Sequence, residues 1–224
     1  CFDCGQEFHG AVSLALGWAC WKMYVGQPEA NPTRCGALRN LGCALRVNGR
    51  TAEALPILET NLALMQRCWP KSKGVIDFAQ SDLANCLGDL GRHDEALVIK
   101  REIYRKSRAA LGDTHEETII LAINLSTSLA HANGSEAITL LRKTLPDTQR
   151  GLGDRHDFTF RVVGLFAEVV AQSATSREEV VEADALVEKY IQIVCQVLGR
   201  GHPLTQNFLL TSASLRSRLE SFPA

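Results

Sequence analysis

The sequence predicts an all-α protein made of repeated helical hairpins, because three separate motifs recur along its 224 residues in one order. The first is a leucine-led apolar pattern whose leading residues, Leu41, Leu83 and Leu125, each lie 42 residues from the next. The second places Glu-Ala-Leu or Glu-Ala-Ile shortly after a glycine, at 49–55, 91–97 and 134–138. The third is Leu-Gly-x-x-His, in the segments 111–118, 152–159 and 198–205. A shared order and nearly equal spacing indicate a repeat architecture.

Each repeat is predicted to contain two helices. Leu41, Ala44 and Leu45 recur at three- and four-residue spacing, which makes one apolar stripe on a helix. Gly49 and Gly91 follow where that helix should end, because glycine readily adopts the left-handed conformation of a C-cap. The Glu-Ala-Leu segment then opens a second helix. Its small alanines allow the two helices to approach closely; they are Ala54, Ala96 and Ala137.

The segment Leu-Gly-Asp closes the second helix, and the next helix begins just after it. Asp113 or Thr114, followed by two glutamates, is predicted to be an N-cap or part of a capping box. His115, His156 and His202 recur at this place once per repeat, about 10 Å apart if hairpins stack. Metal ligands must share one point about 2 Å away. We therefore expect these histidines to form hydrogen bonds at helix starts and not to bind metal.

Together these motifs resemble the tetratricopeptide repeats (TPRs) of kinesin light chains and of the related light-chain-like repeat proteins. The resemblance covers about residues 28–218 and implies a hairpin solenoid wound as a right-handed superhelix, with about four repeats and capping helices. The second unit departs from the pattern, since it has Lys71-Ser72-Lys73-Gly74 where the others have Gly-Asp-x-His or a close variant. The expected repeats are 28–69, 70–112, 113–153 and 154–200, with a closing helix at 203–219 and a tail at 220–224.

An N-terminal segment, 1–27, is expected to contain cysteines and a capping helix at about 10–25. Leu14, Leu16, Trp18 and Trp21 should cover the first hairpin. The apolar run from Ala11 to Val25 contains a lysine and is too short to span a bilayer. The chain begins with Cys1 instead of methionine, so we expect a fragment or a processed piece.

Charge and cysteine placement narrow the function. The formal net charge is −1 and no dense Lys/Arg cluster is present, so neither nucleic acid nor a membrane surface is an expected partner. The eight cysteines are mostly scattered singly, which suits reduced thiols and a cytoplasmic protein. Cys1-x-x-Cys4 is either half of a zinc site, whose matching pair would have to come from upstream sequence, or a pair of unpaired thiols at the terminus. We predict no bound metal and no cofactor.

No catalytic constellation is recognisable. The sequence lacks a Gly-Lys-Ser/Thr phosphate loop, a Gly-x-Ser-x-Gly elbow and a His-Glu-x-x-His motif. A covalent enzyme needs a nucleophile, a base and an orienting group together. We therefore predict that the protein is not an enzyme.

The resemblance implies that the first helix of each hairpin lines a concave, peptide-binding groove. Some family members clamp a peptide's C-terminal carboxylate with two asparagines and several basic residues. Asn85, Asn124 and Arg161 match three of those places, but Ser81 and Leu165 stand where basic residues are expected. The predicted groove residues are Arg39, Cys43, Arg46, Ser81, Asn85, Asp89, Asn124, Thr127 and Arg161. The alternative, that these are solvated polar residues without a ligand, stays open.

The expected function is that of a monomeric interaction scaffold whose partner is a protein or peptide segment. The predicted groove holds three arginines (Arg39, Arg46 and Arg161) and two acidic residues (Asp89 and Glu168). This modest excess of positive charge predicts a partner with some acidic character. The alternative is a regulatory or targeting repeat domain of a larger enzyme or zinc-finger protein whose chemistry lies in an N-terminal part outside this sequence.

Overall fold

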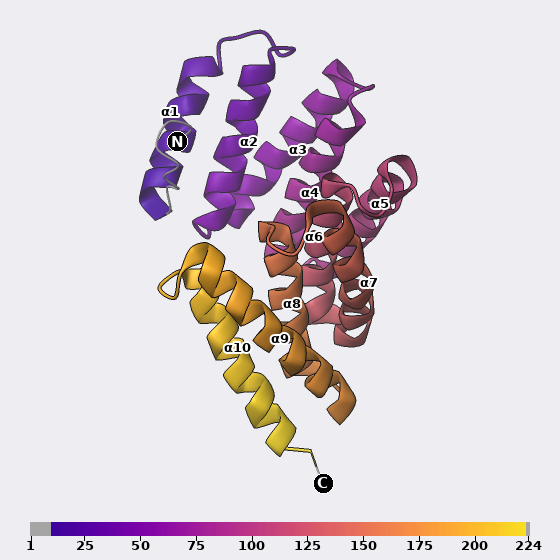
Figure 1. Cartoon of the computed structure of the whole chain (residues 1–224). Coiled ribbons are helices and arrows are strands. Elements are labelled where there is room, and N and C mark those ends of the chain that lie inside the picture. Colours follow the sequence, from indigo (N-terminus) through magenta and orange to yellow (C-terminus); the bar gives the residue numbers. More distant parts are fainter. Residues whose placement is uncertain (1–9, 223–224) are drawn as a thin grey trace. The chain divides into compact units, whose positions relative to one another are not determined.

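The computed structural model describes residues 10–222, and these form α-helices and no strand (Figure 1). The predicted all-α class is therefore confirmed. The chain divides into two compact units, unit 1 up to Ile103 and unit 2 from Tyr104, and each is described by itself. The helices are α1 (Gly10–Tyr24), α2 (Pro32–Val47), α3 (Thr51–Cys68), α4 (Lys73–Asp89), α5 (His93–Leu111), α6 (Glu116–Ala132), α7 (Gly134–Leu152), α8 (Asp157–Ser173), α9 (Arg177–Leu198) and α10 (Pro203–Glu220).

Glycines end the helices where the sequence predicts. Gly49 and Gly91 have φ values of 76° and 78°, in the left-handed region that a side chain with a Cβ rarely adopts. They follow the first helices α2 and α4. The glycines after the second helices α5, α7 and α9 are also left-handed; they are Gly112, Gly153 and Gly199. Both kinds of predicted helix stop are confirmed.

Histidines cap three of the first helices. The Nδ1 atoms of His115, His156 and His202 each accept a hydrogen bond from the backbone N–H two residues ahead, at 3.2 Å. The expected structural role of these histidines is confirmed. The prediction that Asp113 or Thr114 is the N-cap was wrong: His115 holds that place, and the carboxylate of Asp113 pairs with Arg108 on the preceding helix.

A threonine completes this junction in two of the loops. The hydroxyl groups of Thr159 and Thr205 donate to the carbonyls of Gly153 and Gly199, at 2.7 and 2.8 Å. Both threonines are fully buried. The recurrent Gly-x-x-His-x-x-Thr pattern thus links the end of one hairpin to the start of the next. Its recurrence reflects structure, and no binding chemistry is needed to explain it.

In unit 1, α2 packs against α1, α3 and α4. Gly17 of α1 makes the first contact close, because a Cβ there would lie 3.3 Å from both Leu41 and Ala44. Figure 1 shows α1 beside α2 at the edge of this unit. Leu14 and Trp21 pack on the core, but Leu16 and Trp18 are 48% and 38% exposed, so only half of the predicted covering residues face the hairpin.

In unit 2, α8 is the central helix and contacts α6, α7, α9 and α10. Its Phe160 meets Tyr190 of α9 edge to face, with ring centroids 6.3 Å apart. The buried Tyr190 hydroxyl donates to Asp154 at 2.5 Å, which ties α9 to the loop before α8.

The alanines predicted to allow close helix packing are buried in both units. Ala54, Ala96 and Ala137 are each at most 1% exposed.

Within the described part of the chain, no helix is both long and apolar enough to cross a membrane.

Candidate functional site

The nine predicted groove residues lie on the first helices of hairpins, in both units. Six belong to α2 and α4 of unit 1, and three belong to α6 and α8 of unit 2. The two groups are described separately, each within its own unit. We use "α2–α4 face" for Arg39, Cys43, Arg46, Asp82, Asn85 and Asp89.

Helical spacing brings the residues of the α2–α4 face together. Within each helix they recur every three or four residues and so share one side. Two ion pairs then join the helices. Arg39 pairs with Asp82 through two nitrogens, and the Arg46 guanidinium lies 2.7 Å from the Asp89 carboxylate. Both pairs link residues 43 positions apart, so they form two equivalent rungs, two helical turns from each other.

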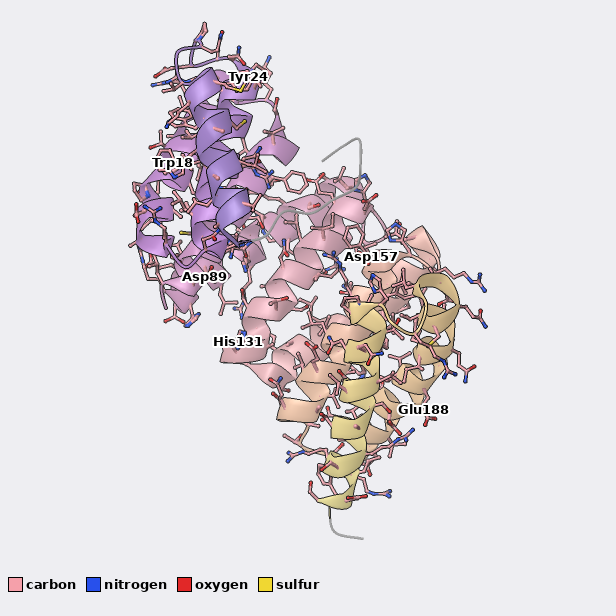
Figure 2. All side chains as sticks on the ribbon, turned by 90° about the vertical axis from the view of Figure 1, so that its left-hand side faces the viewer. Trp18, Tyr24, Asp89, His131, Asp157 and Glu188 are labelled. Atoms are coloured by element: carbon pink, nitrogen blue, oxygen red, sulfur yellow. The ribbon has the colours of Figure 1, made fainter. Side chains whose placement is uncertain are left out.

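The two rungs differ in exposure. The Asp82 side chain is 14% exposed, whereas Asp89, which is labelled in Figure 2, is 45% exposed in the last turn of α4. Cys43 lies between the two arginines on α2, and burial together with the nearby Asp82 carboxylate raises its pKa to about 11. This thiol stays protonated at neutral pH, so it is a poor nucleophile.

A buried lysine lies close to the second rung. Lys100 of α5 is 5% exposed, and burial together with the nearby Arg46 lowers its pKa to about 8, against the attraction of Asp89. This lysine therefore does not lie on the exposed outer side of the hairpin. Its position in the repeat is occupied elsewhere by the buried side chains of Leu58, Leu141 and Val187.

Ser81 presents almost no surface to a partner, because it is only 4% exposed. Arg39, one repeat earlier, is 42% exposed at the corresponding position, since its long side chain extends to solvent and to Asp82. Asn85, between the two aspartates in the sequence of α4, is half-buried.

In unit 2, the three predicted residues are more dispersed. Asn124 is half-buried on α6, and the exposed Thr127 donates its hydroxyl to the Ile123 carbonyl at 2.9 Å. Arg161 of α8 lies 2.8 Å from the carboxylate of Asp157, which Figure 2 labels at the start of that helix, and its guanidinium lies 5.6 Å from the centre of the Phe158 ring.

A groove that the sequence motifs did not predict lies between α8 and α10 of unit 2. This α8–α10 groove has a volume of about 510 Å³ and is lined by Glu168, Ala171, Gln172, Asn207, Leu210, Thr211 and Ser214. Asn207 donates to Glu168 at 2.8 Å across it. Leu210 is 68% exposed at its edge. The sequence holds a signal for it, since the predicted closing helix α10 occupies the same place in the repeat as α8, the first helix of its hairpin.

The expected basic excess does not exist on these faces. Arg39, Arg46 and Arg161 are each paired with a carboxylate, and Asp82 and Asp157 had been left out of the charge count. Asp157 could have been found from its i, i+4 spacing to Arg161. The expectation of an acidic partner therefore loses its basis.

Cys1 and Cys4, the conditional zinc ligands, lie outside the described residues. Between residues 10 and 222, no group of three or more His, Cys, Asp or Glu side chains could hold a metal ion. The six cysteines described there are free thiols.

Several solved structures share this architecture. The chain is 17% identical to a Podosopora anserina kinesin light chain-like protein with nearly identical TPR-like repeats, with a TM-score of 0.65, 88% of this chain covered and 100% of the other. BtubC (BKLC) from P. vanneervenii is 13% identical, with a TM-score of 0.64 and 97% and 95% of the two chains covered.

A third structure, a Rap protein complexed with Competence and Sporulation Factor, is 11% identical, with a TM-score of 0.57 over 92% of this chain and 58% of the other. No protein-family model and no curated protein sequence matches the chain. At these identities the likeness concerns the fold. The all-helical structure and these neighbours together show that the chain has a tetratricopeptide-repeat fold of the kinesin light chain-like type.

Proposed function

We propose that the protein is an interaction scaffold that binds a peptide or partner segment on the first-helix faces of its hairpins, and that it acts by binding and not by catalysis. The observation that carries this proposal is the polar lining of those faces. On the α2–α4 face, Arg39 and Asp89 remain 42% and 45% exposed although both are ion-paired. These exposed charged groups are accessible to a partner.

The α2–α4 face offers donors and acceptors in equal measure. A guanidinium has five N–H donors, and an ion pair with one carboxylate leaves some of them free to bind another acceptor. The exposed Asp89 can accept from a peptide N–H. Two arginines and two aspartates give the face no net charge. A face without net charge is better suited to bind the backbone of an extended segment than to bind a strongly acidic segment.

The α8–α10 groove would add an apolar contact in unit 2. Leu210 and Ala171 provide apolar surface. The Gln172 amide can donate and accept hydrogen bonds, and the Glu168 carboxylate can accept them. We also propose a cytoplasmic setting, since scattered free thiols suit a reducing compartment. The Rap protein supports the proposal by analogy, because its structure is complexed with another factor.

The test is a selection of peptides that bind the immobilised full chain, followed by calorimetry with the selected sequences. Asn85→Ala should weaken peptides that bind unit 1, and Asn124→Ala those that bind unit 2, by about three- to tenfold, the range for a lost neutral hydrogen bond. Gln66→Ala is the matched control, because this exposed amide lies on α3, a second helix.

If every selected peptide binds both asparagine variants with unchanged affinity, the first-helix faces are not the binding surface. Loss of binding in Gln66→Ala alone would point to the opposite side of the hairpins.

A further inference from the structure

A separate recess lies in unit 1, lined by α1, the α1–α2 loop, α2 and α3. We call it the Trp21 pocket. Its volume is about 500 Å³, within the range typical of small-molecule sites. Trp21, Leu38, Ile57 and Leu64 form its apolar lining, and two of these, Leu38 and Leu64, are only 5% and 6% exposed. The pocket is thus built on the core of the first hairpin.

The charged residues of this pocket leave it with a net positive charge. They are Glu29, Arg34 and Arg67. Arg67 pairs with Glu29, and both side chains are more than half exposed. No carboxylate within residues 10–222 forms an ion pair with Arg34. The Arg34 guanidinium therefore has no ion-pair partner beside the apolar lining of the pocket.

Arg34 is held in a fixed position. Its guanidinium carbon lies 5.9 Å from the centre of the Trp21 ring, and its Nη1 donates to the Gln27 carbonyl at 2.6 Å. Its Nε is buried and has no hydrogen-bond partner. A carboxylate in the pocket would therefore contact the guanidinium through its Nη groups, and a carboxylate is the acceptor that best matches a guanidinium in charge and shape.

We propose that the Trp21 pocket binds a small amphipathic carboxylate, with its apolar body on Trp21, Leu38 and Ile57 and its carboxylate on Arg34. The ligand must be compact, because the pocket is lined by one hairpin and α1 and does not run along successive repeats. The site is distinct from the α2–α4 face, since Arg34 and Leu38 lie on another side of α2 from Arg39, Cys43 and Arg46.

The probe is phenylbutyrate, with phenylbutanol as the neutral analogue and butyrate as the analogue without the ring. Binding is followed by the indole N–H signals of the three tryptophans in nuclear magnetic resonance spectra, with Trp21 assigned through Trp21→Phe. Phenylbutyrate should shift the Trp21 signal saturably. Each analogue should bind at least about tenfold more weakly, since each loses either the charge-assisted hydrogen bonds or the apolar contact.

Two variants test the site itself. Arg34→Gln should weaken phenylbutyrate by about tenfold and leave phenylbutanol nearly unchanged. Ala63→Phe fills the pocket from an exposed position of α3, so the fold should survive and binding should be lost. Ala52→Phe is the matched control, because Ala52 is exposed on the same helix but does not line the pocket.

The proposal is overturned by any of three results: no saturable shift of Trp21, equal affinity for phenylbutyrate and phenylbutanol, or unchanged binding in Ala63→Phe. These outcomes do not depend on the peptide experiment, because none of the pocket residues belongs to the first-helix faces tested there. A circular dichroism spectrum of each variant confirms that its helices are intact.

Discussion

The α4–α5 hairpin and the α8–α9 hairpin are built from the same repeat but begin differently. His156 caps α8, and its backbone ψ of 144° is extended, which aims the imidazole at the N–H of Phe158. Ser72 precedes α4 with a ψ of 69° and makes no side-chain cap hydrogen bond. A serine can cap a helix, so the backbone conformation and not the residue type is what removes the cap here.

The packing of the two hairpins differs in the same direction. Phe166 of α8 is 2% exposed, whereas its equivalent Leu83 of α4 is only partly buried. Val187 of α9 is 1% exposed, and its equivalent in α5 is the buried Lys100. The α4–α5 hairpin thus lacks three features that stabilise the α8–α9 hairpin: a side-chain N-cap, a fully buried residue at position 83 and an apolar residue at position 100. The same hairpin supplies Asp82, Asn85 and Asp89 to the α2–α4 face.

The largest effect should come from emptying well-packed positions. Leu125→Ala, at a residue 4% exposed, should destabilise the protein by about 2–5 kcal/mol, the usual range for a buried leucine. Leu83→Ala should cost less, about 1–2 kcal/mol, because part of its side chain already contacts water. Urea unfolding followed by circular dichroism gives both values. Equal costs at the two positions would show that Leu83 is packed as well as its equivalent Leu125 on α6.

The second test replaces the buried lysine. Lys100→Leu restores the apolar residue found at Leu58 and Leu141 and should stabilise the protein at neutral pH by up to about 3 kcal/mol. The folded protein releases the lysine proton near pH 8, while the unfolded chain holds it up to about pH 10.5. The unfolded state thus binds more protons between these values, so wild-type stability should rise with pH across this window and the advantage of the variant should shrink.

Taking the difference between wild type and Lys100→Leu at each pH removes the contributions of other groups, such as Cys43, that titrate in the same range. Lys143→Leu is the control, because Lys143 is exposed on α7. A pH-independent difference for Lys100→Leu would mean that the lysine keeps its ordinary pKa in the folded state.

The fold could be predicted because its signals are local. A glycine at a left-handed position ends a helix through its own backbone, and the cap at His156 reaches only two residues along the chain. The site depends on contacts between helices. Arg39 pairs with Asp82, 43 residues later, and nothing at either position alone indicates that partner. The repeat spacing shows which positions are equivalent in successive hairpins. It does not show how each helix is rotated about its axis, which decides which side chains meet.

One missed feature had a signal in the sequence. Lys100 stands in a column of otherwise apolar residues, and reading the second helices by column would have placed it inside the hairpin. The Trp21 pocket had no such signal, because Trp21, Arg34 and Ile57 are brought together only by the packing of three helices.

The smallest expected effect comes from removing the N-cap side chains of α8 and α4. His156→Ala should cost about 1 kcal/mol, the typical value of a lost N-cap, because the N–H of Phe158 then has no side-chain acceptor. Ser72→Ala should change stability by less than about 0.5 kcal/mol, since no cap is lost.

Asn31→Ala shows whether the missing cap is particular to the α4–α5 hairpin or common to unit 1 as a whole. Asn31 caps α2 by accepting from the N–H groups of Thr33 and Arg34, at 2.9 and 3.3 Å, so its loss should resemble that of His156. His156→Asn should restore most of the stability, because an asparagine oxygen can accept the same hydrogen bond. If Ser72→Ala proved as costly as His156→Ala, α4 would be capped in solution, and the α4–α5 hairpin would lose one of the three features that set it apart.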